Sequence, residues 1–388
     1  MHLSIRQYLE TMDDPEGLTR TLGPFGVCRL PDGSPARWVG NSAVVFKISC
    51  GGKFRMLKCY TRPMRRLEAI YGERFLPEEI YLWQPDGNGV WGDAVIDDWI
   101  EGATLREELL RAVRSGDTER LAQLAAAFDR MALGMLRSPT AHGDLKPENI
   151  LVGPEGALRP IDFDCAFLPA FAGERSPELG TAAYQHPART PEDFDAAIDD
   201  YSIALISTTL HALALNPGLL ALGDTEEGVL LVPRTLLGGR SEAYAETLAL
   251  FERAGDAVRY RIARLLRSPL LRLPTLRRLL EYAVEGPSGQ ADRSELFVRD
   301  GLWGFRTAAG ETIPPLYDAA FDFTEGLAAV RTGRCWHFID GGGRVAIDCA
   351  HCTAVKPFAG GRAVVVHGGE RRTIDRRGRE ALWIFEGK

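Results

Sequence analysis

The sequence predicts an α+β protein whose last quarter is all β. From Trp38 to Lys58, apolar and β-branched residues lie on either side of a Gly51-Gly52 turn, a pattern typical of a β-hairpin. From Glu119 to Arg137, apolar residues recur at helical spacing along one face. Beyond residue 295, short strand patterns separated by glycine turns recur after 33 and 35 residues. Such a period indicates stacked β units.

Length and composition bound the possible functions. A chain of 388 residues predicts two domains, and 45% hydrophobic residues are enough for full cores. The net charge is −7, with 32 basic against 40 acidic residues up to position 290 and 14 against 13 after it. This balance does not favour nucleic-acid binding. The seven cysteines are scattered, which is typical of reduced thiols in a cytoplasmic protein.

The apolar stretches of the chain predict neither export nor a membrane span. The first residues lack the long apolar core of a secretory signal. The longest apolar stretch, Ile203–Gly223, is interrupted by His211, Asn216 and Pro217. It therefore predicts a buried helix followed by a turn.

The other elements follow in chain order. Ser4 and Gln7 have the spacing of a capping box and predict a short helix through about Thr11. Residues 15–35 are rich in Gly and Pro and predict loop or edge strand. The remaining predictions are a helix after Thr61 with Leu67 and Ile70 on one face, a strand ending near Glu101-Gly102, a helix opening near Thr104, a short strand Ile150–Val152, and helices within 260–282 that break at Pro269 and Pro274.

Two short stretches in the middle of the chain contain the residues of a phosphoryl-transfer site. The first is residues 141–152, Ala-His-Gly-Asp-Leu-Lys-Pro-Glu-Asn-Ile-Leu-Val, and the second is Ile161–Asp164. Phosphoryl transfer needs a carboxylate for the acceptor hydroxyl, with cations and metal ligands around the phosphates. Oxygen ligands are the type that Mg²⁺ prefers when a nucleotide's phosphates share it. These groups are supplied by the carboxylate of Asp144, the cation of Lys146 and the oxygen donors Asn149 and Asp162.

These stretches resemble the catalytic loop and metal-binding loop of protein kinases, whose pattern is His-Arg-Asp-Leu-x-x-x-Asn followed by Asp-Phe-Gly. The resemblance implies a two-lobed protein-kinase-like domain over residues 1–288, with an N-terminal lobe over about 1–98 and a C-terminal lobe over about 102–288. It also implies that the protein uses ATP and Mg²⁺.

The same resemblance implies a role for individual residues. Lys58 would hold the α and β phosphates, Asp144 would orient the acceptor hydroxyl and Lys146 would neutralise the γ-phosphate. Asn149 and Asp162 would bind the metal. In the family a helix glutamate pairs with the strand lysine, for which Glu68 is the first choice here and Glu73 the second. The nucleotide would also contact Gly40 and Val45 of the covering loop, Asp98, Trp99 and Ile100 of the hinge, and Leu151 of the strand beneath it.

Several positions depart from the kinase pattern. Gly143 replaces an arginine, which predicts that phosphorylation of the activation loop is not the switch. Asp164 replaces a glycine, the residue with the most permissive backbone angles. In the loop that would cover the nucleotide, Trp38 and Ala43 stand where the family has glycines.

The segment Gly180–Pro187 resembles the end of a kinase activation segment, with Ala188 where the family has glutamate. The resemblance implies that Thr181 lies near Asp144 and Lys146. It also implies that Asp199 caps backbone amides beneath the catalytic loop.

Residues 285–290 form a linker by composition, and a repeated pattern follows it. Trp303 and Trp336 are 33 residues apart, and residues 323–330 recur 35 positions later as residues 358–365. The units resemble bacterial WG repeats, with Trp303-Gly304 as the clearest instance and Trp336-His337 and Arg371-Arg372 as eroded ones. The resemblance implies a β domain over 295–388 that binds a protein partner or substrate, or caps the kinase lobe.

A cysteine- and histidine-containing segment, Cys349-Ala350-His351-Cys352, lies within these repeats. It offers three candidate metal ligands, whereas a structural zinc site usually needs four. The sequence therefore predicts a polar turn between strands.

The sequence as a whole is similar to bacterial serine/threonine protein-kinase-like proteins with C-terminal WG repeats, which implies transfer of phosphate from ATP to protein hydroxyls. Two alternatives remain open. Small-molecule kinases of the aminoglycoside or choline type also use His-Gly-Asp in this loop, which Gly143 favours, whereas Lys146-Pro147-Glu148 favours a protein substrate. The other alternative is a non-catalytic scaffold that binds nucleotide and presents the repeats.

Overall fold

The computed structural model describes residues 3–84, 86–223, 230–239, 241–287, 289 and 293–380. Ser288 and Gln290 of the expected linker, and residues 381–388 of the expected repeat domain, lie outside the described residues. Contacts within the chain divide it into two compact units. Unit 1 comprises Met1–Gly102 and Asp162–Ala166, and unit 2 comprises Ala103–Ile161 and Phe167–Lys388.

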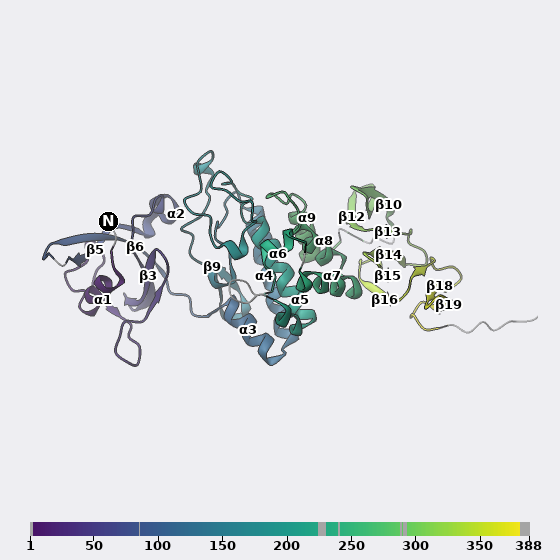
Figure 1. Cartoon of the computed structure of the whole chain (residues 1–388), viewed down its shortest axis with the longest axis horizontal. Coiled ribbons are helices and arrows are strands. Elements are labelled where there is room, and N and C mark those ends of the chain that lie inside the picture. The colour runs from purple at the N-terminus through teal and green to yellow at the C-terminus, as the bar shows by residue number, and fades with distance from the viewer. Residues whose placement is uncertain are drawn as a thin grey trace, which may run out of the picture. The chain divides into compact units, whose positions relative to one another are not determined.

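Unit 1 is built on a six-stranded antiparallel sheet (Figure 1). The strand order is β1-β3-β4-β6-β5, and β2 pairs with the free part of β3. The hairpin predicted around Gly51-Gly52 is confirmed, because β3 and β4 are paired from Ala43↔Tyr60 to Cys50↔Lys53. The strands are β1 (Phe25–Val27), β2 (Arg37–Val39), β3 (Ala43–Cys50), β4 (Lys53–Tyr60), β5 (Phe75–Trp83) and β6 (Gly89–Asp98).

The two faces of this sheet differ because side chains alternate along a strand. One face is apolar and packs against Tyr8 and Met12 of helix α1 (Ile5–Asp13). The other face carries a row of residues paired across four neighbouring strands: Trp38 on β2, Val45 on β3, Lys58 on β4 and Val95 on β6. Strand pairing therefore places Val45 and Lys58 side by side, 13 positions apart in sequence.

The helices of unit 1 follow the predictions in part. Helix α1 has the predicted capping box, since the Ser4 hydroxyl accepts from the Gln7 amide while the Gln7 side chain accepts from the Ser4 amide. Helix α2 (Leu67–Tyr71) begins later than a cap at Thr61 predicts. A residue that precedes a proline is kept out of the helical region, and Pro63 lies in this interval.

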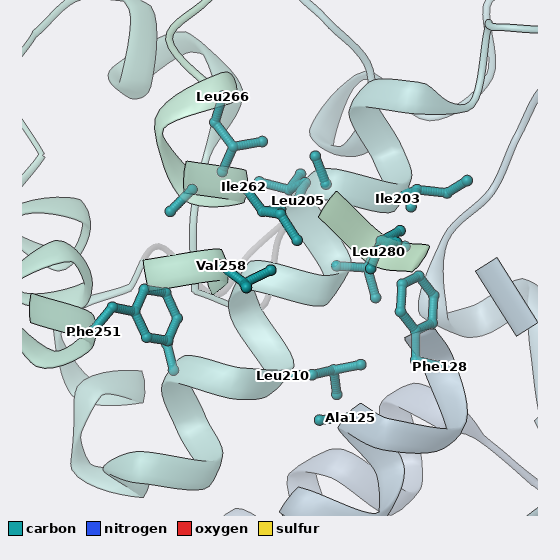
Figure 2. Packing of buried hydrophobic residues seen from close by; sticks show 14 of the residues in the cluster. Ala125, Phe128, Ile203, Leu205, Leu210, Phe251, Val258, Ile262, Leu266 and Leu280 are labelled. Carbon is teal, nitrogen blue, oxygen red and sulfur yellow. The ribbon is translucent and has the colours of Figure 1, made fainter. Parts of the chain in front are cut away.

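Unit 2 contains a bundle of helices around one large apolar core (Figure 2). Helix α4 presents Ala125 and Phe128, and helix α5 presents Ile203, Leu205 and Leu210 to this core. Helix α5 is buried on nearly all sides and is followed by a turn of 3-10 helix, as predicted for this apolar stretch. The helices are α3 (Leu105–Ser115), α4 (Thr118–Arg137), α5 (Asp200–Leu215), α6 (Pro233–Leu237), α7 (Glu242–Ala254), α8 (Ala257–Leu265) and α9 (Leu276–Glu285). Within the described ranges, none of the helices has both the length and the apolar character to cross a membrane.

A buried polar cluster ties three of these helices together. The Asp129 carboxylate of α4 accepts hydrogen bonds from Ser207 (2.7 Å) and His211 (2.8 Å) of α5 and pairs with Arg259 of α8 (2.6 Å). Burial alone would raise the pKa of Asp129, but these three partners lower it below its ordinary value. The carboxylate therefore stays ionised, as a buried charge with partners on every side does.

A small three-stranded sheet joins the start of α3 to the segment that follows the first motif. It consists of β7 (Ala103–Thr104), β8 (Ile150–Val152) and β9 (Leu158–Pro160), all antiparallel. Strand β8 confirms the predicted strand over Ile150–Val152. The Thr104 hydroxyl caps α3 by accepting from the Glu107 amide, as the sequence predicts for a helix opening there.

Over residues 293–380 the C-terminal part of unit 2 is all β, as predicted, and the three small antiparallel sheets described there are equivalent hairpin units. In each unit, the residue at the tryptophan position of the WG pattern is the second residue of a strand. It pairs across the hairpin with the residue five positions earlier: Trp303↔Val298, Trp336↔Arg331 and Arg371↔Val366. This common register confirms the repeat. The strands are β10 (Glu295–Arg299), β11 (Leu302–Thr307) and β12 (Gly310–Tyr317); β13 (Ala319–Ala320), β14 (Ala328–Thr332), β15 (Cys335–Ile339) and β16 (Val345–Cys349); and β17 (Ala354–Val355), β18 (Arg362–His367) and β19 (Glu370–Asp375).

The first two repeats share the apolar core of the helices. Phe305 of β11 and Ile313 and Tyr317 of β12 belong to the same buried cluster as the side chains of α8 and α9, and β12 lies beside these helices (Figure 1). Strand β14 divides two cores by alternation, with Val330 in the helical cluster and Ala329 in a second cluster that the repeats form among themselves.

Polar contacts reinforce this junction. The buried Arg261 of α8 donates through Nε to the Leu316 carbonyl (2.6 Å) and pairs with Asp318 (2.9 Å). His337 stands where a WG repeat has glycine, and its Nε2 lies 2.9 Å from the Glu252 carbonyl at the end of α7. The eroded second repeat therefore contacts a helix through the residue that departs from the WG pattern.

Candidate functional site

The predicted site residues fall into two clusters, one in each unit. We name the first the Lys58 cluster, which consists of Lys58, Tyr60, Tyr71, Asp162 and Asp164 in unit 1. The Lys58 amine bonds to Asp162 Oδ1 (2.5 Å) and Asp164 Oδ2 (2.7 Å). The other oxygen of Asp164 accepts from the hydroxyls of Tyr60 (2.9 Å) and Tyr71 (2.7 Å).

The charges of the Lys58 cluster are set by this geometry. Burial would lower the pKa of the Lys58 amine, but the charges and hydrogen bonds of Asp162 and Asp164 outweigh it, and the pKa is raised. Burial also raises the pKa of the Tyr60 and Tyr71 hydroxyls, so both remain protonated donors. The cluster therefore holds the Lys58 ammonium between two carboxylates, one of which also accepts from two protonated tyrosine hydroxyls.

We name the second set the Asp144 cluster, which consists of Asp144, Lys146, Asn149 and Thr181 in unit 2. Asp144 Oδ1 accepts from the Thr181 amide (2.6 Å), and Oδ2 lies 3.2 Å from the Lys146 amine. Lys146 also donates to the Thr181 hydroxyl (2.8 Å). The sequence predicted that Thr181 lies near Asp144 and Lys146, and these contacts confirm it.

Asn149 is held from within the same loop. Its Nδ2 donates to the Asp144 carbonyl (2.9 Å) and lies 3.3 Å from Asp144 Oδ2. The amide nitrogen is thus engaged with Asp144, and the side-chain oxygen is the atom that remains for a cation.

Asn149 in unit 2 and Asp162 in unit 1 each carry an oxygen donor of the type that Mg²⁺ prefers. Both present oxygen donors, and the Asp162 side chain is 45% exposed. Across the part of the chain that the structure describes, no group of three or more His, Cys, Asp and Glu side chains gathers as a metal cage. Mg²⁺ is usually held by one or two protein ligands, with phosphates and waters completing its shell, so each of these residues suits such a ligand set.

The loop that carries Asp144 is fixed from beneath. The Asp199 carboxylate accepts from the backbone amides of His142 and Gly143 (2.9 Å for Gly143), which confirms the predicted capping role of Asp199. His142 Nε2 lies 2.7 Å from the Ile161 carbonyl. Gly143 has φ +82°, a left-handed conformation that an arginine adopts at a cost.

Arg189 holds the same loop from another side. Its Nη1 donates to the carbonyls of Gly143 (3.1 Å) and Leu179 (3.1 Å) and to Gln185 Oε1 (2.5 Å). Ala188 replaces the glutamate that the kinase pattern has at the preceding position. The buried Arg189 therefore joins the Asp144 loop to the segment after it by hydrogen bonds to carbonyl groups.

Gly180 allows this segment to approach Asp144. Its φ is +72°, and a Cβ there would lie 2.7 Å from the Gly143 carbonyl oxygen and 2.8 Å from Asp144 Oδ1. We expect Gly180→Ala to lower the free energy of unfolding by about 2 kcal/mol or more, since the backbone strain and the clash with a backbone atom add.

Thermal unfolding of Gly180→Ala beside Gly173→Ala separates the two causes of this loss. Gly173 also has a left-handed φ of +85°, but its Cβ would meet nothing within 4 Å. We expect the Gly173 variant to lose less stability and to keep the loop intact. Equal losses of stability in the two variants would show that the close approach of Gly180 to Asp144 does not add to the destabilisation.

Asp200, next to Asp199, is a buried carboxyl whose ionisation lowers the free energy of unfolding. Burial raises the pKa of Asp200 to about 6, and Asp199 and Asp195 add to the shift, while the Leu273 amide and Arg272 oppose it. Between pH 4 and 6 the folded state therefore holds a proton that the unfolded state releases, so the free energy of unfolding falls as the pH rises.

Replacing Asp200 with Asn removes this ionisation. We expect Asp200→Asn to be more stable than the wild type at pH 7, by at most about 3 kcal/mol for a shift of this size, with the difference shrinking as the pH falls to 4. Denaturant unfolding at a series of pH values measures it, and a difference that does not change with pH would contradict the buried ionisation of Asp200.

The remaining predicted residues lie in the two units as follows. Gly40 forms a tight turn in which its amide donates to the Ala43 carbonyl (2.9 Å). Glu68 is exposed on α2, and the ion pairs of Lys58 run to Asp162 and Asp164. Asp98 pairs with Arg55 (3.0 Å), and the Trp99 amide donates to the Phe54 carbonyl (3.2 Å). Ile100 lies just beyond strand β6, and Leu151 is the central residue of β8 in unit 2.

The structure also shows residues that the sequence reasoning missed. Tyr60 and Tyr71 complete the Lys58 cluster, and Arg189 binds the Gly143 carbonyl. A signal existed for Tyr60, because residues two apart on a strand share a face, and Tyr60 follows Lys58 by two. No local signal marks the bond of Tyr71 to Asp164 or that of Arg189 to the Gly143 carbonyl, since these partners lie 93 and 46 residues away.

Comparisons with known proteins match two parts of the chain. Residues 310–334, which include β12, β13 and β14, match the family model of the WG containing repeat. The chain is also similar to the serine/threonine-protein kinase PknL of Mycobacterium tuberculosis (strains CDC 1551 / Oshkosh and ATCC 25618 / H37Rv) and of Mycobacterium bovis (strain ATCC BAA-935 / AF2122/97), with 32% identity over 115 residues in each case. The matched segment spans 29% of this chain and 29% of each relative.

Proposed function

We propose that this protein is an ATP- and Mg²⁺-dependent phosphotransferase that phosphorylates serine or threonine hydroxyls of proteins. The observation that carries the proposal is the Asp144 cluster, in which the Lys146 amine lies within hydrogen-bond distance of both the Asp144 carboxylate and the Thr181 hydroxyl, while the Thr181 amide donates to Asp144. The partial similarity to a serine/threonine-protein kinase supports the same class of reaction. As part of this proposal, residues 1–288 form a two-lobed protein-kinase-like domain.

The chain's own residues suit the steps of such a transfer. Asp144 Oδ2 would accept a hydrogen bond from the acceptor hydroxyl and take its proton as the hydroxyl oxygen bonds to the γ-phosphorus, while the bond from that phosphorus to the β–γ bridging oxygen breaks and ADP leaves. Lys146, 3.2 Å from this oxygen, would stabilise the negative charge of the transferred group. Lys58 would bind the α and β phosphates, while Asn149 and Asp162 would hold Mg²⁺, which neutralises phosphate charge when it is bound.

The repeats would serve this activity by binding a protein partner or substrate. The match to a WG containing repeat supports a binding role for the C-terminal β region. Because the first two repeats share a core with α8 and α9, a partner bound there would be held on the same compact unit as Asp144.

A second candidate function is phosphorylation of a small molecule. The observation that favours it is Gly143, whose left-handed backbone fits a His-Gly-Asp loop better than a His-Arg-Asp loop. The Lys146 to Thr181 hydrogen bond favours a protein acceptor, because this lysine and threonine belong to the serine/threonine kinase pattern.

Transfer from ATP labelled on the γ-phosphate distinguishes these functions. The purified full chain is incubated with Mg²⁺ and the labelled ATP, alone, with generic protein acceptors, and with an aminoglycoside or choline. We expect label on protein serine or threonine, lost when EDTA removes Mg²⁺. Label on the small molecule alone would support the second candidate. Binding of Mg·ATP without transfer to any acceptor would support a nucleotide-binding scaffold.

A further inference from the structure

We infer that Asp164 is the positioning residue for the Lys58 amine, in the place that a helix glutamate takes in the kinase pattern. The inference rests on the proposed function, in which Lys58 binds nucleotide phosphates. It assigns a role to the residue that departs from the Asp-Phe-Gly pattern.

Asp164 is buried, and both of its carboxylate oxygens bond to protein donors. The residue is 5% exposed, and Lys58 is 7% exposed. Its Oδ2 binds the Lys58 amine, while its Oδ1 accepts from both tyrosine hydroxyls. With both oxygens bonded to protein donors, the carboxylate has one orientation, and the Lys58 amine is directed by a fixed partner.

The backbone does not explain the aspartate. Among the described residues with left-handed φ, Asp162 is included (φ +67°) and Asp164 is not. A glycine at position 164 would therefore relieve no strain. The aspartate at this position therefore matters for its side chain, which bonds to Lys58, Tyr60 and Tyr71.

The other candidate carboxylates are less suited to hold Lys58. The Asp162 side chain is 45% exposed, against 7% for that of Asp164. Asp162 is also the proposed metal ligand, and a carboxylate that binds Mg²⁺ has less charge to offer an amine. Glu68 is exposed on α2. Asp164 is thus the partner of Lys58 that does not compete with metal binding.

Asp164 also connects two elements of unit 1 to the amine. Tyr60 ends β4, two residues after Lys58, and Tyr71 ends α2. Helix α2 therefore reaches Lys58 through Tyr71 and Asp164. In the kinase pattern the equivalent helix reaches the lysine directly through its glutamate.

The test is a double-mutant cycle on nucleotide binding by the full chain. Asp164→Asn keeps an oxygen for the two tyrosines but turns an amide nitrogen toward the Lys58 ammonium. Binding of a fluorescent ATP analogue with Mg²⁺ is titrated in the wild type, Asp164→Asn, Lys58→Met and the double variant. We expect Asp164→Asn to weaken binding roughly tenfold, the scale of coupling between contacting residues. In the Lys58→Met background we expect Asp164→Asn to have no further effect.

Controls separate positioning from general loss of structure. Asp14→Asn removes the same charge from an exposed residue of unit 1, and we expect wild-type binding. If Asp164→Asn does not fold by circular dichroism, Asp164→Gly replaces it in the cycle, since the family itself has glycine there. A merely structural role would lower the melting temperature without coupling to Lys58.

Each outcome decides a different claim. A wild type that binds no Mg·ATP overturns the proposed function and the inference with it. A wild type that binds, with Asp164 variants within twofold of it or with effects that add to those of Lys58→Met, overturns the inference alone. Weakening by Glu68→Gln that depends on Lys58, together with normal binding by Asp164→Asn, would restore the helix glutamate as the partner.

Discussion

Asp144→Asn is expected to lower the rate of phosphoryl transfer by about 10²–10⁴-fold, the usual contribution of a positioned acid–base group, while leaving Mg·ATP binding close to that of the wild type. The asparagine keeps an oxygen that can accept from the Thr181 amide, so the loop stays in place. It removes the negative oxygen that lies 3.2 Å from Lys146 and that would receive the acceptor proton.

Initial rates of label transfer and a nucleotide titration measure the two parts of this prediction. Asp322→Asn is the matched control, because it makes the same change on an exposed residue of the repeats. Transfer by Asp144→Asn at a rate within tenfold of the wild type would exclude Asp144 as the residue that handles the acceptor proton.

Ending the chain after Pro287 is expected to prevent stable folding of the helical part of unit 2. The cut removes the apolar side chains that the repeats contribute to the helical core: Phe305, Ile313, Leu316, Tyr317, Ala328, Val330 and Ile339. Each large one stabilises the fold by about 1.5–3 kcal/mol, so their sum is on the order of 10 kcal/mol. A typical net stability is about 5–15 kcal/mol. The cut also leaves the buried Arg261 without the Leu316 carbonyl and Asp318.

Expression and circular dichroism of the shortened chain measure this result. Two point variants test separately the core shared with the helices and the core among the repeats. Phe305 and Phe338 are both fully buried, but Phe305 lies in the core shared with the helices and Phe338 in the core among the repeats. Each Phe→Ala change is expected to cost about 3–5 kcal/mol.

Hydrogen exchange should tell the two variants apart. In Phe305→Ala we expect faster exchange in α8 and α9, and in Phe338→Ala we expect it in β15 to β19. A shortened chain with native helical content and a cooperative melt would show that the repeats are dispensable for the helices.

Much of the local structure was predictable because its signals are local. The capping box at Ser4, the helix opening near Thr104, the helix ending at Arg137 and the strand over Ile150–Val152 all appear as predicted. The repeat was predictable for the same reason, since its period of 33 to 35 residues is the length of one hairpin unit. These features depend on residues within a few positions of one another.

The sequence predicted most residues of the candidate site, but it predicted fewer of the contacts between them. The motif identified Asp144, Lys146 and Asn149, and the structure brings them together with Thr181. The sequence also identified Lys58, but it predicted Glu68 on α2 beside it, and the structure pairs Lys58 with Asp162 and Asp164. Which carboxylate reaches a buried amine depends on how segments more than 100 residues apart meet.

The sequence by itself determined the α+β composition, the repeat and the residue types of the candidate site, because periodicity, helix caps and short motifs depend on neighbouring residues. Only the tertiary structure decided that Asp164 binds Lys58, that Arg189 holds the Gly143 carbonyl, and that the repeats share the core of α8 and α9. Those outcomes depend on burial. A buried charge or carbonyl needs a hydrogen-bond partner, and the packing of distant segments decides which group lies close enough. A local sequence pattern therefore does not identify that partner.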